Sequence, residues 1–290
     1  MTPAPGPAPL ETEVVAYPPA WRLAASVLTA FSHGSLLAIL AALFLMENPP
    51  TNPFKQYRLF LGLFAAPEAA AWLLARAFAG TARIEPGRLV LVQREQRIEV
   101  PLEAIAGAAV WRVPLPRRGV SLRLRSGRRF VRALEVKDPA AFVEALVVAG
   151  ASPSLREGLA TRAAAYTSAL ATCAVHRLDR LWLKFGVYSL VPAIPAFRLN
   201  QWITYGGTFG EYYTFGLKAY LLAFAIWWSS WAFNLVMIAA GIRAVVEAVA
   251  MLAAAASPAW AGPVRRGMEV AQRATFYVGV PLWIALRFMA

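Results

Sequence analysis

The sequence predicts a polytopic α-helical membrane protein of five, or six, spans that carries one inserted extramembrane α+β domain. Two observations support this fold class. The 290-residue chain is 59% hydrophobic with a mean hydropathy of +0.50, whereas soluble domains are about 45–50% apolar. In addition, a polar, arginine-rich insert at residues 81–180 separates two groups of apolar segments, and several of these reach the ~20 residues that a membrane helix needs.

The N-terminal apolar segments predict a transmembrane hairpin over residues 21–80. Its two spans are Ala24–Met46 and Leu59–Ala79. The prolines of Glu47–Pro53 would interrupt any helix, so this stretch is predicted to be the turn between them. Residues 1–20 are rich in proline and alanine and are predicted to be a disordered tail.

Residues 81–150 change to a period of two, which indicates antiparallel strands. Glycine-containing pairs such as Ser126-Gly127 punctuate the runs. Asp138-Pro139 then predicts the start of a helix over Ala140–Val148, because aspartate suits an N-cap and proline suits the first turn. The predicted strands are Ala82–Glu85, Arg88–Gln93, Arg97–Val100, Ala108–Pro114, Val120–Leu124 and Arg129–Leu134.

Two stretches within residues 82–149 resemble the bacterial pleckstrin-homology-like domains found in membrane proteins. They read "ARIEPGRLVLVQREQRIEVPLEAIAGAAVWRVPL" and "VSLRLRSGRRFVRALEVKDPAAFVEALV". The resemblance lies in strand order, turn placement and the terminal helix, and covers about a quarter of the chain. It implies a small bent barrel or orthogonal sheet capped by a helix, and it implies no enzymatic activity.

The remainder of the chain is predicted to be a helical connector at residues 151–180 and a C-terminal transmembrane domain at residues 181–290. Ala244–Ala256 contains Glu247 and is either an extension of the preceding helix, an interfacial helix or a sixth crossing. Arg287 is expected to reach the membrane interface from the last span. The predicted spans are Leu181–Phe197, Ala219–Ala240 and Ala274–Ala290.

Charge predicts the orientation and the partners. The insert 81–180 holds 17 Lys+Arg against 9 Asp+Glu, so the positive-inside rule predicts that the insert is cytoplasmic. The bias towards Arg, Ala, Gly and Pro is typical of a bacterial chain, which predicts the bacterial inner membrane. The net charge of +13 predicts anionic lipid headgroups as partners, and another membrane protein is a second possibility. Nucleic acid is not expected, because no aromatic residues interleave with the arginines.

A basic strand edge is the predicted lipid-binding site. Arginine suits phosphate groups because its planar guanidinium donates two parallel hydrogen bonds. A solvated strand face would produce the same pattern. The predicted lipid-binding residues are Arg117, Arg118, Arg123, Arg125, Arg128, Arg129 and Arg132.

His33 and Glu68 are the candidate catalytic pair. Each lies near the middle of its predicted span, and the two spans of a hairpin run antiparallel, so both side chains are expected at a similar depth. An ionisable group inside a membrane requires a partner. The pair is either a proton relay or polar substrate site, or a hydrogen bond that locks the hairpin.

The segment Arg198–Glu211 is predicted to be a loop dense in groups that bind ligands. It is either a ligand site or an aromatic belt at the membrane interface with a glycine-rich turn. The candidate ligand-binding residues are Arg198, Asn200, Gln201, Tyr205 and Glu211.

The leading functional hypothesis is a non-enzymatic, membrane-anchored binding or assembly protein. Two histidines and one cysteine cannot supply a His/Cys metal site, and no nucleotide or hydrolase motif occurs, so neither a metal nor a cofactor is expected. The alternative is an intramembrane enzyme or transporter for a lipid-like or small polar substrate. That alternative requires His33, Glu68 and the Arg198–Glu211 loop to meet around one cavity.

Overall fold

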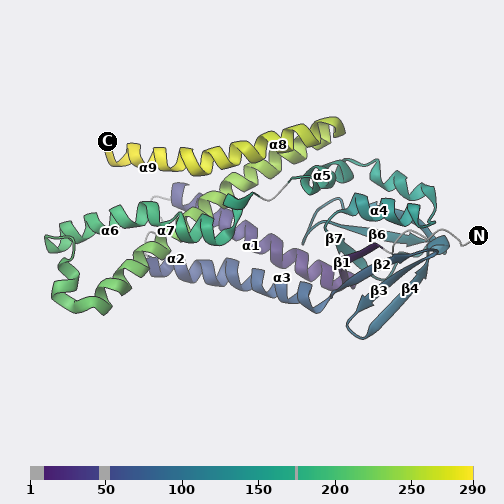
Figure 1. Cartoon of the computed structure of the whole chain (residues 1–290), viewed down its shortest axis with the longest axis horizontal. Coiled ribbons are helices and arrows are strands. Elements are labelled where there is room, and N and C mark those ends of the chain that lie inside the picture. The colour runs from purple at the N-terminus through teal and green to yellow at the C-terminus, as the bar shows by residue number, and fades with distance from the viewer. Residues whose placement is uncertain (1–9, 46–52, 174–175, 290) are drawn as a thin grey trace, which may run out of the picture. The chain divides into compact units, whose positions relative to one another are not determined.

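The computed structural model describes residues 10–45, 53–173 and 176–289. The chain divides into two compact units, and Figure 1 shows one sheet and a set of long helices. Two long helices, α1 (Pro19–Leu45) and α7 (Gly210–Ala256), contribute residues to both units. The first unit comprises the chain up to His33, Gly62–Cys173 and Ala248–Gly267, and the second comprises Gly34–Leu61, Ala174–Glu247 and Met268–Ala290.

The first unit is built on a curled antiparallel sheet in the order β4-β3-β2-β1-β7-β6-β5. The antiparallel strands predicted for residues 82–149 are confirmed, although β7 begins at Ala133 instead of Arg129. The strands are β1 (Leu10–Tyr17), β2 (Ala79–Glu85), β3 (Arg88–Gln93), β4 (Gln96–Pro101), β5 (Ile105–Val110), β6 (Gly119–Leu124) and β7 (Ala133–Val136).

Strand β1 shows that the prediction of a disordered tail over residues 1–20 was wrong for its second half. This strand lies in the centre of the sheet, where it pairs with both β2 and β7. Val15 lies opposite Ala79, the first residue of β2. The valines and terminal tyrosine of β1 favour extended backbone. The strands with which β1 pairs, however, come after the hairpin in the sequence, so the pairing is not a local signal. Residues 1–9 of the predicted tail lie outside the described residues.

Alternation along the strands divides their side chains between two faces. Ala16 of β1 and Leu134 of β7 are buried in the core of the sheet unit. Tyr17 and Glu135, the next residue on each strand, therefore lie on the opposite face. Both are also buried, at 0% and 7% exposure, so the second face of the sheet is covered as well.

Helix α4 (Pro139–Val148) packs on the core face of the sheet and confirms the predicted helix. Asp138 is its N-cap, and the carboxylate accepts hydrogen bonds from two backbone N–H groups at 3.0 and 3.1 Å. Phe142, Val143 and Leu146 are almost completely buried against the strands. Burying side chains of this size contributes about 1.5–3 kcal/mol each, which makes α4 an integral part of the sheet unit.

The predicted hairpin is helical on both sides and is joined directly to the sheet. Its first side is α1, and its second side consists of α2 (Pro53–Leu59), the π-helical segment η1 (Phe60–Ala65) and α3 (Ala66–Ala77). Pro67 is in the first turn of α3, where proline is tolerated. Of the predicted turn Glu47–Pro53, residues 47–52 lie outside the described residues.

The predicted connector, residues 151–180, is helical in three short pieces. These are the 3-10 helix η3 (Pro153–Leu159), α5 (Arg162–Ala171) and the 3-10 turn η4 (Arg177–Asp179). Tyr166 and Ala169 of α5 pack in the first unit against small residues near the end of α7 and in α8 (Pro258–Ala274). Helix α5 is therefore part of a packed cluster.

The C-terminal region is also helical. The π-helical segment η5 (Trp182–Val187) leads into α6 (Leu190–Tyr205), and the chain ends with η6 (Thr275–Gly279) and α9 (Val280–Met289). Gly216 breaks the start of α7 with φ 86°. Ala244–Ala256 continues α7, which agrees with the first of its three interpretations.

Within the described residues, three helical segments are long and apolar enough to cross a membrane: Pro19–Ala42, Lys55–Ala77 and Gly210–Ala256. The first two coincide with the predicted hairpin, and the third contains the predicted span Ala219–Ala240. The total of five or six spans stays a prediction. The side chain of Arg287 lies outside the described residues.

Candidate functional site

A cavity of about 600 Å³ lies at the base of the hairpin, within the first unit. Its volume falls in the range of small-molecule sites. Four parts of the fold contribute to it: α1, the η1–α3 segment, the end of β1 with its neighbour β7, and the loop between β5 and β6. The lining residues are Tyr17, Thr29, His33, Phe64, Ala65, Glu68, Ala69, Ala71, Trp72, Ala75, Pro116, Arg117 and Glu135.

The register of the sheet brings Tyr17 and Glu135 into this cavity. Val15 pairs with Glu135 across β1 and β7, and Tyr17 follows two residues later on the same face of β1. The loop between β5 and β6 is held to the helix base by Trp111, whose ring lies 3.6 Å from the Arg22 guanidinium carbon of α1. Pro116 and Arg117 of this loop therefore lie beside the hairpin.

Three buried oxygen atoms in this cavity have no partner with hydrogen-bond geometry, although the Tyr17 phenol and the Glu135 carboxyl are close enough to influence each other's pKa. They are Tyr17 Oη, Glu68 Oε2 and Glu135 Oε2. Among the described residues, no other buried side-chain oxygen lacks a partner. Buried polar atoms without partners cost about 1–3 kcal/mol each and are uncommon in folded proteins. Their occurrence around a single cavity indicates a site that binds a hydrogen-bond donor.

The electrostatics of the cavity are dominated by Glu135. Burial raises the pKa of this carboxyl, and the nearby charge of Arg117 opposes the rise. The ion pair between Arg117 Nη1 and Glu135 Oε1 is long, at 3.8 Å, and the arginine side chain is 71% exposed. Burial, and then the charge of Glu135, raise the pKa of the Tyr17 phenol. The carboxyl is thus only partly compensated by the arginine.

His33 and Glu68 line the same cavity, as their predicted proximity requires. Within the described part of the chain, their side chains form no hydrogen bond or ion pair with each other, and Nδ1 of His33 donates to the Thr29 carbonyl at 2.9 Å. The Phe64 ring lies edge-on to the imidazole at 6.3 Å between centroids. The residues of the predicted Arg198–Glu211 loop belong to the second unit.

The predicted lipid-binding arginines lie in three places. Arg117 lines the cavity, Arg118 donates to the Thr167 carbonyl at 3.5 Å, and Arg132 donates to Gln96 at 3.3 Å. The other four surround the turn between β6 and β7, and all four are exposed. We call them the tip arginines: Arg123, Arg125, Arg128 and Arg129.

The tip arginines lie at the end of the sheet from which the hairpin leaves. Tyr17, the last residue of β1, pairs with Ala133, the first residue of β7. The turn between β6 and β7 must therefore be at that end. The turn between β3 and β4 is at the same end, where Arg94 and Arg132 line a hollow together with Ala77 and Phe78 at the end of α3.

Arginines elsewhere on the sheet are paired with carboxylates. Arg83 pairs with Glu11 at 3.2 Å, and Arg88 pairs with Glu85 at 2.7 Å and with Glu99 at 3.1 Å. For the tip arginines, the described residues include no ion pair. The hairpin end of the sheet thus carries uncompensated positive charge.

The prediction that Arg198–Glu211 is a loop was wrong for its first half, because α6 continues to Tyr205. The turn is confined to residues 206–209, and Gly206 ends the helix in the left-handed region with φ 74°. Gln201 is fully buried. Its amide donates to Glu211 Oε2 at 2.6 Å and accepts from the Glu211 backbone N–H at 3.1 Å, so the two residues join α6 to α7.

The other three candidate ligand-binding residues show no common site. Arg198 lines a small hollow with Phe209 and Tyr220. Asn200 accepts a 3.5 Å hydrogen bond from Thr204. The ring of Tyr205 lies 6.3 Å from that of Phe215. A ligand role for these five residues stays a prediction.

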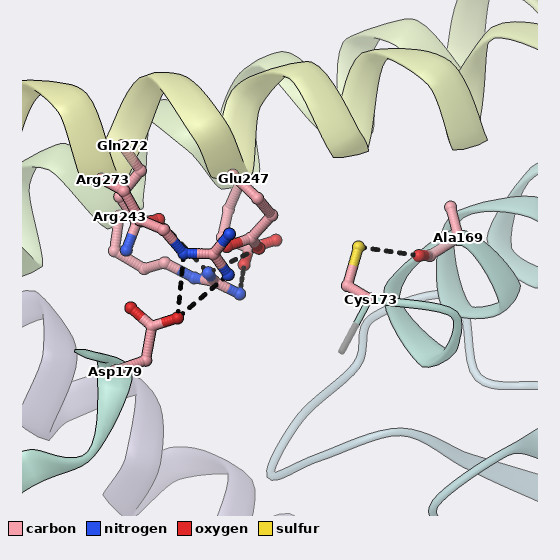
Figure 2. A network of polar contacts seen from close by, with 8 residues as sticks. Ala169, Cys173, Asp179, Arg243, Glu247, Gln272 and Arg273 are labelled. Carbon is pink, nitrogen blue, oxygen red and sulfur yellow. Dashed lines mark hydrogen bonds and ion pairs between the residues drawn. The ribbon is translucent and has the colours of Figure 1, made fainter. Parts of the chain in front are cut away.

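Figure 2 shows a polar network in the second unit. Arg243 of α7 pairs with Glu247 at 2.6 Å and with Glu269 at 2.8 Å. Arg273 pairs with Asp179 at 3.0 Å. Opposite charges from three elements are matched here, which indicates a structural role. Within the described residues, no group of three or more His, Cys, Asp or Glu side chains could hold a metal ion.

Comparisons of the chain with protein-family models, curated protein sequences and solved structures gave no match. Function is therefore inferred from the chemistry of the sites themselves.

Proposed function

We propose that this chain is a membrane-anchored binding protein whose sheet unit docks on anionic lipid headgroups. The observation that carries the proposal is the position of the tip arginines at the end of the sheet from which the apolar hairpin leaves. If the hairpin enters a bilayer, these side chains lie on the side of the sheet nearest to the lipid headgroups.

The charge distribution supports docking on lipid more than a solvated face. Near a membrane surface, each cation adds roughly 1 kcal/mol of attraction to anionic lipid. The four tip arginines are exposed, whereas Arg83 and Arg88 are compensated by glutamates. Neutralised cations contribute little to long-range attraction, so the attraction should act at one end of the sheet.

The sheet unit fits a pleckstrin-homology-like domain with one departure. Antiparallel strands followed by α4 agree with the expected order. The departure is β1, a central strand that precedes the hairpin in sequence. We infer a domain assembled around its own membrane anchor, in the cytoplasm of a bacterium, as the excess of 17 Lys+Arg over 9 Asp+Glu in residues 81–180 favours.

An intramembrane enzyme or transporter is less well supported. His33 and Glu68 do share a cavity, which that alternative requires. It also requires residues of Arg198–Glu211 at the same site, and these belong to the second unit. Gln201 and Glu211 are already bonded to each other. A binding function accounts for the observations with fewer assumptions.

A fluorophore near the tip arginines tests the proposal in the full-length protein. Single cysteines at Ser126 and Lys137 would be labelled after Cys173→Ser, since both positions are exposed and lie at opposite ends of β6 and β7. The protein would be reconstituted with headgroup spin-labelled lipid. We expect strong quenching at Ser126 and weak quenching at Lys137, and the Ser126 quenching should require phosphatidylglycerol. Equal quenching at both positions would refute docking by this end of the sheet.

A further inference from the structure

We infer that the cavity at the hairpin base binds the headgroup of an aminophospholipid, with its primary ammonium among the three unpartnered oxygens and its phosphate towards Arg117. This inference rests on the proposed membrane location of the hairpin. It concerns a different surface and a different lipid from the docking proposed for the tip arginines.

The unpartnered oxygens determine the cationic half of the ligand. Tyr17 Oη, Glu68 Oε2 and Glu135 Oε2 can each accept a hydrogen bond, and all three are buried. A primary ammonium has three N–H donors, as many as there are oxygens to satisfy. With one arginine and two carboxylates, the ionised cavity has a deficit of positive charge, which favours a cation over a neutral polyol.

Arg117 determines the anionic half. Its guanidinium is 71% exposed and lies 3.8 Å from Glu135 Oε1, so it keeps donors free for a second acceptor. A guanidinium group can donate two parallel hydrogen bonds to two oxygens of one phosphate. The cavity presents hydrogen-bond acceptors beside a guanidinium group. Phosphatidylethanolamine carries the complementary groups, because two carbons separate its ammonium from its phosphate.

The length of the hairpin determines where this cavity meets the bilayer. Helix α1 has 27 residues, which corresponds to about 40 Å, whereas the hydrocarbon core is about 30 Å thick. About 10 Å of the helix therefore projects on the side of the sheet. At about 1.5 Å per residue, Thr29 and His33 lie about 15 and 21 Å from the start of α1, which is roughly 5 and 10 Å inside the hydrocarbon core. The cavity therefore extends from headgroup level at Tyr17 into the upper acyl region, where Phe64, Trp72 and several alanines provide an apolar wall.

Native mass spectrometry of the full-length protein in mild detergent tests the inference. Dioleoylphosphatidylethanolamine and dioleoylphosphatidylcholine would compete for the protein, because the second lipid carries a trimethylated nitrogen without N–H donors. We expect a preference of about tenfold or more for the ethanolamine lipid, comparable to the loss of one charged hydrogen bond. Equal retention of the two lipids would overturn the inference.

Variants identify the site. Glu68→Gln and Glu135→Gln should each abolish the preference, while Glu144→Gln, an exposed carboxylate paired with Arg156, should retain it. The preference is the ratio of the two lipid-bound forms of the folded protein in one mass spectrum. Partial unfolding of a variant therefore does not change this ratio. An unchanged preference in both cavity variants would refute the assignment. Free phosphoethanolamine should compete poorly, and displacement of the lipid at equal concentration would show that the ligand is the free headgroup and would overturn the assignment to a membrane lipid.

The test is independent of the docking proposal. Replacing Arg123, Arg125 and Arg129 with Gln should leave the preference for the ethanolamine lipid unchanged, because none of these residues lines the cavity. Loss of the preference in this variant would argue against a separate site at the hairpin base. Loss of docking with an unchanged lipid preference would support two separate surfaces.

Discussion

Val15 and Ala79 are cross-strand partners, although the whole apolar hairpin lies between them in the sequence. The backbone N–H of Ala16 also donates to the Phe78 carbonyl at 2.9 Å. The hairpin therefore begins and ends in adjacent strands of one sheet. Any motion of one helix base must be accommodated by the sheet, which couples the hairpin to the sheet.

The first prediction concerns the contribution of β1. A fragment of residues 81–151 lacks this strand, so its remaining strands would form two groups without hydrogen bonds between them. Such a fragment should unfold without cooperativity. Joining residues 10–17 to residues 78–151 through a flexible linker should restore a cooperative thermal transition, measured by circular dichroism.

A control variant tests the packing of the added strand. Val14 is 4% exposed in the core, and a charge there would be buried without a partner. Val14→Asp in the linked protein should remove the cooperative transition. Cooperative unfolding of the fragment without β1 would show that the central position of this strand is not required.

The second prediction compares two variants with the same loss of charge. Arg123, Arg125 and Arg129 would be changed to Gln in one, and Arg83, Arg88 and Arg156 in the other. The first should lose most of the lipid-dependent quenching at Ser126, because unpaired cations are removed. The second should keep it, because those arginines are paired with carboxylates. Raising the salt concentration should reduce the quenching at Ser126 as the first variant does, since screening limits the range of interactions between surface charges to about 8 Å at 0.15 M.

The third prediction concerns pH. Burial raises the pKa of Glu135 above the ordinary value of 4.5, so the folded protein holds this proton more tightly than the unfolded chain. The resulting stability is complete below pH 4.5 and is lost as the pH rises through the higher folded pKa. In lipid-free detergent, Glu135→Gln should therefore gain about 1–2 kcal/mol over the parent near neutral pH, and the gain should shrink towards pH 4.5.

Thermal unfolding at several pH values measures this difference. Glu144→Gln provides the control, because that carboxylate is exposed and paired with Arg156. Its stability relative to the parent should not follow the same pH dependence. A constant difference between Glu135→Gln and the parent across the range would contradict a raised pKa.

The sequence contained most of the information about local structure in the insert. Alternation predicted β2, β3, β4 and β6 within a few residues, and Asp138-Pro139 predicted the start of α4. These signals are local, since period and capping depend on neighbouring residues. The strand-like residues of β1 were present too, but proline-rich flanks suggested disorder, and the pairing with Ala79 is a long-range contact.

The candidate site was only partly predictable for the same reason. His33 and Glu68 could be paired because antiparallel spans place them at one depth. Tyr17, Arg117 and Glu135 join them from two strands and a loop. The register Val15↔Glu135 brings the two strands together, and the contact between Trp111 and Arg22 brings the loop to the helix base. Glu135 alternates with Leu134 and Val136 as an exposed strand residue would, so no local sequence signal marked it as buried.

The fourth prediction concerns Gln201 and Glu211. Gln201→Leu removes both hydrogen bonds between α6 and α7 and leaves Glu211 without its partner, so the unfolding free energy should fall by about 1–3 kcal/mol. Asn200→Ala, which removes only a 3.5 Å contact with Thr204, should have a small effect. Unchanged stability of Gln201→Leu in detergent would instead favour the ligand role predicted from the sequence.

The central claim is that the hairpin crosses the membrane and returns to the sheet from which it leaves. Labelling of intact cells with a membrane-impermeant maleimide tests this most directly, using single cysteines at positions 13, 126 and 52 after Cys173→Ser. Glu13 and Ser126 are exposed on the sheet unit, and residue 52 lies outside the described residues. We predict labelling at position 52 in intact cells, and at positions 13 and 126 only after lysis. Labelling of positions 13 and 126 from opposite sides of the membrane would contradict the pairing of β1 with β2 and the account built on it.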